Sequence, residues 1–125
     1  MSGPVGEALD TGVIDGLRAS VEGDTAFVIE LIDAFLADSA TQLQAIDIAV
    51  TAGDPEAVVR PAHTLKSASA TLGAMQLSTS ARTLEMAGRA GSIDSAEARE
   101  AAATIRAAWD AAAAALRAWS ADQDR

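Results

Sequence analysis

The stretch FVIELIDAFLADSATQLQAI, residues 27–46, indicates the fold class of this 125-residue chain. Its apolar residues recur at helical spacing, and Asp24 ahead of it is a residue type favoured as an N-cap. The pattern predicts a helix to about Ala52, roughly 40 Å long at about 1.5 Å per residue, a length suited to a helical bundle. The side chains expected to share its apolar face are Phe27, Leu31, Phe35, Leu43, Ile46 and Val50.

Helix-breaking and helix-capping residues separate this helix from its neighbours. On the N-terminal side, EGD at 22–24 breaks the chain after a short helix that begins near Asp10 or Thr11. On the C-terminal side, GDPE at 53–56 places Gly53 at a helix end, Asp54 as a cap and Pro55 at a first helical position. The next helix is therefore expected from there to about Leu72, with Pro61 inside it and Gly73 closing it.

Two more helices complete the expected fold. One spans roughly 75–90, and the last begins at a capping pair formed by Asp94 and Glu97. The apolar stripe of the last helix is Ile105, Trp109, Ala112, Leu116 and Trp119. Together the segments predict an all-α protein: an antiparallel four-helix bundle with a short additional N-terminal helix over residues 10–120, and flexible ends at 1–9 and 121–125.

Composition excludes several kinds of function. The chain has no cysteine, which favours an intracellular, cytoplasmic location, and it has no apolar run long enough for a membrane span. Its net charge of −9 argues against nucleic-acid and anionic-membrane partners. The acidity is uneven, since residues 1–53 carry nine acids and one Arg, whereas residues 54–91 carry three acids and four basic residues. The middle segment therefore suits an anion.

The only histidine and the only lysine of the chain lie in that segment, in AHTLKSASATLGA at 62–74. At 100° per residue, a core-facing stripe is expected from Val58, Ala62, Leu65, Ser69 and Leu72. His63 lies roughly opposite this stripe. Among the residues that project within about 60° of it are Val59, Lys66, Ser67 and Ala70. We therefore expect an outward-facing imidazole with a lysine one turn away and small neighbours.

Several interpretations of His63 compete. A solvated surface histidine needs no function. A metal site would lack a second His or any Cys, and a hydrolytic pair with Ser67 lacks an obvious orienting carboxylate. Neutral imidazole, however, is a nucleophile that forms covalent intermediates near pH 7. A phosphoryl group on it would be steadied by Lys66, and small neighbours would let another protein approach.

AHTLKSASATLGA closely resembles the signature of histidine-containing phosphotransfer (HPt) domains, the intermediate carriers of multistep two-component phosphorelays. The resemblance extends through FVIELIDAFLADSATQLQAI, AGDPEAVVRPAHTLK and LSTSARTLEMAGRAG, roughly residues 10–116. It implies a four-helix bundle in which His63 is the phosphoacceptor and Lys66 interacts with the phosphoryl group. Ser67 stands where many members have Gly. Glu85 and Arg89 match positions near the motif helix, although an exposed i,i+4 ion pair explains them equally well.

The resemblance also implies partners and chemistry. Phosphoryl groups pass between His63 and aspartates of receiver domains, including those of a hybrid histidine kinase. The chain would be no enzyme, having no ATP site and no cofactor of its own, because the receiver supplies Mg²⁺ and the acidic residues. We expect a monomer that docks through the outer face of the motif helix, using Val59, Ser67, Ala70 and Arg89, with exposed apolar residues of the first two helices.

Two alternatives stay open. The chain could be a receiver-binding adaptor that accepts no phosphate, although the His63–Lys66 pair speaks against this. It could also be the phosphoacceptor domain of a chemotaxis-type histidine kinase, although the start at Met1 and the lack of a linker or dimerisation segment favour a free protein.

Overall fold

The computed structural model describes residues 8–123, and helices account for nearly all of them. Their bounds are α2 Thr11–Ser20, α3 Thr25–Ala52, α4 Pro55–Thr71, α5 Met75–Arg89 and α6 Ala96–Gln123. The part of the chain described contains no strand. The predicted all-α class is confirmed, and the helix bounds agree with those expected to within a residue or two.

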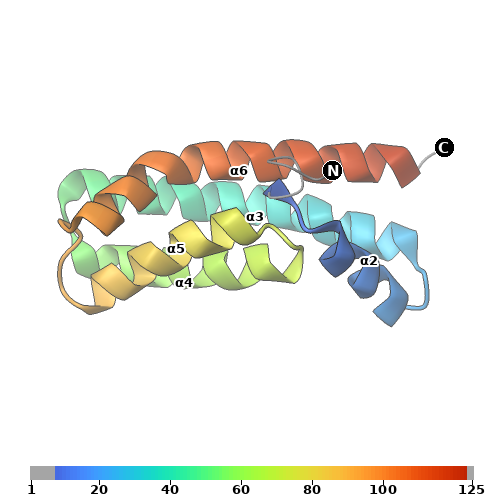
Figure 1. Ribbon diagram of the computed structural model, residues 1–125, viewed down its shortest axis with the longest axis horizontal. Coiled ribbons are helices and arrows are strands. Elements are labelled where there is room, and N and C mark those ends of the chain that lie inside the picture. Colours follow the sequence, from blue (N-terminus) through green and yellow to red (C-terminus); the bar gives the residue numbers. More distant parts are fainter. Residues whose placement is uncertain (1–7, 124–125) are drawn as a thin grey trace.

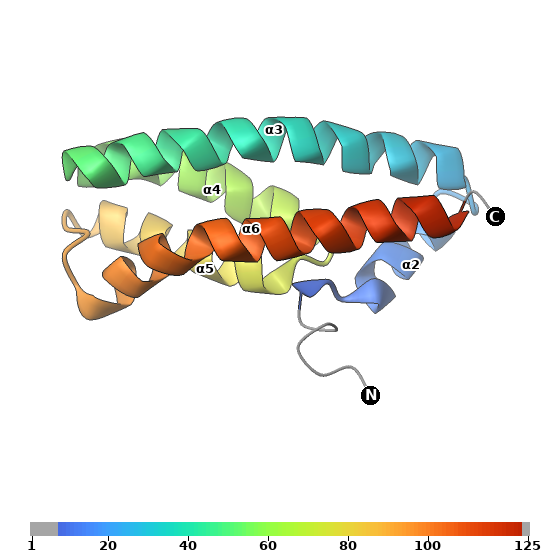
Figure 2. The same cartoon turned by 90° about the horizontal axis from the view of Figure 1, so that it is seen from above.

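Four helices form an antiparallel bundle of two layers. Figure 1 shows α3 and α6 running along the whole length of the molecule, with the α4–α5 hairpin against one part and α2 against the other end. Figure 2, seen from above, shows α3 and α6 side by side in the nearer layer. The predicted bundle with a short N-terminal helix is therefore confirmed. One face of the α4–α5 layer points away from α3 and α6.

Side-chain caps fix most of the helix starts. The carboxylates of Asp10, Asp24 and Asp54 each accept a hydrogen bond from a backbone N–H in the first turn, at 3.0–3.2 Å. Gly53, at φ 66°, ends α3 in the left-handed conformation that glycine adopts without strain. Because these capping signals act within a few residues, the helix ends could be predicted from the sequence.

The cap of the last helix differs from the expected one. Ser95 Oγ accepts the Ala98 N–H at 3.1 Å, and α6 begins at Ala96, so the predicted pair of Asp94 and Glu97 is wrong. Aspartate and serine are equally good N-caps by residue type. The choice between them is set by packing, because Ile93 and Ala98 are both buried and fix how the chain enters the helix.

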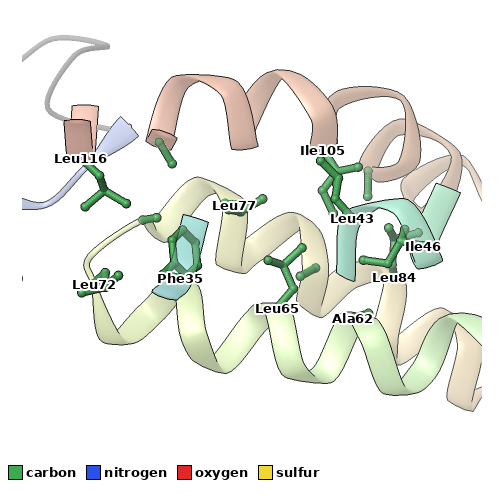
Figure 3. Close-up of a cluster of buried hydrophobic side chains, with 14 of the residues drawn as sticks. Phe35, Leu43, Ile46, Ala62, Leu65, Leu72, Leu77, Leu84, Ile105 and Leu116 are labelled. Carbon is green, nitrogen blue, oxygen red and sulfur yellow. The ribbon is translucent and has the colours of Figure 1, made fainter. Parts of the chain in front are cut away.

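The core lies between the two layers. Figure 3 shows its central side chains, which come from all four bundle helices: Phe35, Leu43, Ile46, Ala62, Leu65, Leu72, Leu77, Leu84, Ile105 and Leu116. In α6 the predicted stripe is confirmed, with Trp109 and Trp119 half-buried at its edge. Trp109 Nε1 donates to the buried Ser39 hydroxyl at 2.7 Å, which joins α6 to α3.

The predicted apolar face of α3 agrees with the structure in the C-terminal part of the helix and is wrong at its start. Val28 and Ile32 are fully buried, whereas Phe27 is 41% exposed and Leu31 is only half-buried. Adjacent apolar pairs, Phe27–Val28 and Leu31–Ile32, offer two stripes one residue apart. At this end α3 packs against α2 and α6 rather than against the α4–α5 hairpin, which selects the second stripe (Figure 1).

The turn between α4 and α5 is tied to the start of α2. Gly73, at φ 83°, accepts a hydrogen bond from Asp10 N–H at 2.7 Å through its carbonyl. A Cβ added to Gly73 would lie 2.6 Å from the Asp10 carbonyl oxygen. Glycine is therefore required here both by the backbone conformation and by the close approach of α2.

The bundle extends slightly beyond the expected limits of residues 10–120. Leu9 is buried, and α6 runs to Gln123, whose side chain accepts a hydrogen bond from Arg18 of α2 at 2.9 Å. The remaining end residues that we expected to be flexible, 1–7 and 124–125, lie outside the described part. Among residues 8–123, no helix combines the length and apolar character needed to cross a membrane.

Candidate functional site: a histidine held by a buried carboxylate

His63 lies on the exposed side of α4. The five residues expected to face the core are all buried, at 0–3% exposure, and they include Ala62 and Leu65 on either side of it. The His63 side chain is 54% exposed. Both halves of the helical-wheel prediction are therefore confirmed, and the imidazole is accessible to another molecule.

Glu85 of α5 contacts His63 across the hairpin. Its Oε2 lies 2.9 Å from His63 Nδ1, although the two residues are 22 positions apart in the sequence. The Glu85 side chain is only 5% exposed. Glu85 and Arg89 do form the i,i+4 ion pair, but its carboxylate is buried rather than exposed. The expectation that His63 lacks an orienting carboxylate is wrong.

Two cationic side chains also surround this carboxylate. Lys66 Nζ lies 2.8 Å from Glu85 Oε1, and Arg89 donates to Oε2 from Nε at 3.0 Å and from a terminal nitrogen at 2.8 Å. The Lys66 contact is an ion pair without good hydrogen-bond geometry at Oε1. The Lys66 and Arg89 side chains are 30% and 58% exposed. Both basic groups can therefore meet an anion at His63.

The charge state of Glu85 follows from these contacts. Desolvation in the buried position favours the neutral acid, but the interactions with Lys66, Arg89 and His63 favour the carboxylate more. Together they lower the pKa of Glu85 from 4.5 to about 2. Glu85 is therefore ionised throughout the neutral range.

An ionised carboxylate also determines the tautomer of His63. It can only accept hydrogen bonds, so the proton of a neutral imidazole must lie on Nδ1, which donates to Glu85. The second ring nitrogen, Nε2, then carries the lone pair. In this arrangement the nitrogen that is free to react is the one farther from the helix backbone.

Close packing of α5 on α4 holds Glu85 in reach. A Cβ on Gly88 would lie 2.6 Å from the Pro55 carbonyl oxygen and 2.6 Å from Val58 Cγ1. About two helical turns before Glu85, Ser78 Oγ donates to the Lys66 carbonyl at 2.9 Å. The missing side chain at Gly88 and the Ser78 hydrogen bond together bring the two helices close enough for the ion pairs.

The structure places the other predicted neighbours of His63 as follows. Ser67 is exposed, and Val59 and Ala70 are half-buried. Part of Val59 contributes to the contact between helices, since its Cγ2 lies at Gly88. Arg89 joins the site through Glu85. Their roles toward a partner remain predictions.

Glu85 is the residue that sequence reasoning undervalued. The available signal was its place in LSTSARTLEMAGRAG, one turn before Arg89 and three residues before Gly88. Helical periodicity alone could not show that α5 turns this side chain toward α4. Among the described residues, no group of three or more His, Asp or Glu side chains is arranged to hold a metal ion.

Comparisons with known proteins identify a matching family and a solved structure of similar fold. A family model described as "Hpt domain" matches residues 30–119. The crystal structure of histidine-containing phosphotransfer protein B from Pseudomonas aeruginosa PAO1 is similar in fold, with a TM-score of 0.79. It shares 24% sequence identity, and the alignment covers 91% of this chain and 95% of the other. A comparison with curated protein sequences found no match.

Proposed function

The chain belongs to the Hpt domain family, and we propose that it carries a phosphoryl group on His63 between aspartates of receiver domains in a two-component phosphorelay. The observation that supports this most directly is the pairing of an exposed imidazole with a buried, ionised carboxylate at 2.9 Å. A solvated histidine without a function would need no such partner.

In the forward step, Nε2 of neutral His63 attacks the phosphorus of a receiver's phospho-aspartate. A bond forms between Nε2 and phosphorus, and the bond between phosphorus and the aspartate oxygen breaks. The electron pair of that bond leaves with the aspartate carboxylate, so no proton has to move. Transfer onward to a second receiver is the same reaction in reverse.

Glu85 and Lys66 stabilise opposite charges during this step. Phosphorylation at Nε2 leaves the ring positively charged while Nδ1 keeps its proton, and the Glu85 carboxylate at Nδ1 compensates that charge. Lys66, one turn along the same helix, supplies a cation for the phosphoryl oxygens. Its ammonium is held near the site beforehand by Glu85 Oε1.

The rest of the chemistry belongs to the partner. The receiver supplies Mg²⁺ and the acidic residues around its aspartate, and the chain acts as a cytoplasmic, monomeric phosphocarrier without an ATP site of its own. Hybrid histidine kinases, which carry receiver domains, are suitable donors. Docking is expected around His63, with Val59, Ser67, Ala70 and Arg89 at its border.

The test is transfer of label from phosphorylated receivers. A panel of receivers charged with labelled phosphate is mixed with the chain, and the label on the chain is tested for stability in acid and in base. We expect acid-labile, base-stable label that is absent from His63→Gln, with helix content unchanged by circular dichroism. Label retained in His63→Gln would contradict the proposal.

The same experiment separates the alternatives. Binding to a receiver without any label on His63 would indicate an adaptor. Label acquired from ATP and a chemotaxis-type kinase core, but from no receiver, would indicate the phosphoacceptor domain of such a kinase.

A further inference from the structure

A cavity lies between α3 and α6. It has a volume of about 240 Å³, and its lining residues come from the C-terminal half of α3 and the N-terminal half of α6: Leu43, Ile46, Asp47, Val50, Ala102, Ile105 and Arg106. Figure 2 shows α6 moving away from α3 toward the end of the molecule where α6 begins, which is the end that contains these residues. Helical bundles commonly build ligand sites in such places, from side chains on facing helices.

The interior of this cavity is apolar. Leu43, Ile46 and Ile105 belong to the core, with exposed fractions of 1–4%, and the half-buried Val50 and Ala102 extend the apolar surface. Ala102 is the smallest of these side chains, so a larger residue at its position would occupy the open space. Dry apolar cavities of about 150 Å³ bind benzene. The cavity between α3 and α6 is therefore large enough for an aromatic ring or a branched aliphatic group.

Two charged side chains of opposite sign border the apolar interior. Asp47 lies on α3 and Arg106 on α6, and both are exposed. Within residues 8–123, neither side chain forms an ion pair with the other or with a third group. An acid and a base that stay apart on facing helices can bind the two charges of one ligand, with an ammonium at Asp47 and a carboxylate at Arg106.

We propose that this cavity binds a small zwitterion with an apolar side chain, that is, an α-amino acid of the leucine or phenylalanine type. The apolar side chain of the ligand packs on Ile46 and Ile105, and its burial drives binding. Asp47 and Arg106 hold the charged groups of the ligand and fix its orientation. The site is separate from the phosphotransfer site, because His63 lies on the exposed side of α4, in the layer opposite α3 and α6 (Figure 1).

The test is a titration of the isotope-labelled chain with phenylalanine and with leucine, followed by two-dimensional NMR of the backbone amides. We expect saturable shifts that are largest at the cavity residues of α3 and α6. Two analogues of phenylalanine measure the contribution of each charge: phenylpropionate lacks the ammonium, and phenethylamine lacks the carboxylate. Since exposed ion pairs contribute little, each analogue should bind roughly three- to fivefold more weakly than phenylalanine.

Three variants locate the binding site. Ala102→Leu places a larger side chain in the cavity and should abolish the saturable shifts. Asp47→Asn and Arg106→Gln lie at exposed positions, so they keep the fold intact, and each should weaken phenylalanine binding roughly three- to fivefold. Arg106→Gln should not weaken phenethylamine, because that ligand has no carboxylate. Asp38→Asn and Arg117→Gln, at exposed positions on the same two helices outside the cavity, are the matched controls and should bind as the wild type does.

Three results would overturn the proposal. The first is the absence of saturable shifts with both phenylalanine and leucine. The second is full binding to Ala102→Leu, which would place the ligand outside the cavity. The third is equal affinity for phenylalanine and toluene, or unchanged affinity in both Asp47→Asn and Arg106→Gln, which would show that the charged groups of the ligand are not recognised. None of these measurements involves transfer to His63, so the proposed phosphotransfer function is tested separately.

Discussion

His63 Nδ1 and Glu85 Oε2 lie 2.9 Å apart and join two helices through the side chain that is proposed to react. Glu85 is buried while His63 is half-exposed, so the carboxylate supports the imidazole from the protein side and leaves Nε2 open to a partner. Lys66 and Arg89 complete the cluster from α4 and α5.

Replacing Glu85 by glutamine should slow transfer to His63. The amide keeps the shape but removes the charge that compensates the phosphorylated ring, and hydrogen bonds to charged groups contribute about 1.5–3 kcal/mol. We expect a loss of roughly 10- to 100-fold in the transfer rate, since about 1.4 kcal/mol corresponds to a factor of ten. Single-turnover transfer from a phosphorylated receiver measures it. Glu97→Gln, at an exposed position on α6, is the control, and equal rates for both variants would remove Glu85 from the mechanism.

Replacing Lys66 by alanine should shorten the lifetime of the phosphohistidine or reduce transfer several-fold, because the phosphoryl oxygens lose the cation that Glu85 holds one turn from His63. The fold should be retained, since the side chain is partly exposed and lies outside the core. Loss of label over time, with Arg99→Ala on α6 as the control, measures the effect. Kinetics equal to those of the wild type would show that Lys66 takes no part.

The pH dependence of stability should carry a contribution from Glu85. Its pKa is lowered from 4.5 to about 2 in the folded state, so the folded protein binds this proton less readily than the unfolded chain does. The contribution to the free energy of unfolding is therefore complete above about pH 4.5 and is lost as the pH falls toward 2. Urea unfolding of wild type and Glu85→Gln should give a stability difference that shrinks over this range. A difference that stays constant with pH would contradict the assigned ion pairs.

Alanine at Gly88 should destabilise the protein although alanine favours helices. The new Cβ would lie 2.6 Å from both the Pro55 carbonyl oxygen and Val58 Cγ1, so α5 must move away from α4. Overpacking of this kind costs about 1–3 kcal/mol. The displacement should also slow transfer to His63, because it carries Glu85 away from the imidazole.

Gly16 provides the matched control for this variant. It lies inside α2, and a Cβ added there would have no atom within 4 Å, so alanine should stabilise the protein by up to about 1 kcal/mol. Thermal unfolding of the two variants should therefore move in opposite directions. A stabilised Gly88→Ala would show that the approach of α5 to α4 is looser than the structure indicates.

Some features could be predicted from the sequence because their causes are local. The caps at Asp24 and Asp54 and the Gly53 turn act within a few residues, so they located the ends of α3 and the start of α4. The core face of α4 repeats with the helical period, which also predicted that His63 is exposed. Two predictions were wrong because adjacent residues of similar type compete. The buried stripe at the start of α3 begins at Val28 instead of Phe27, and the N-cap of α6 is Ser95 instead of Asp94.

The sequence by itself determined the helices, their order and the exposed position of His63 with Lys66 one turn away. Only the tertiary structure decided what the imidazole contacts. Glu85 is 22 residues from His63, and its direction depends on how closely α5 packs on α4 at Gly88. Its ionisation depends in turn on burial and on cations from both helices. Periodicity within one helix carries no information about such a contact, because it arises only when two helices meet.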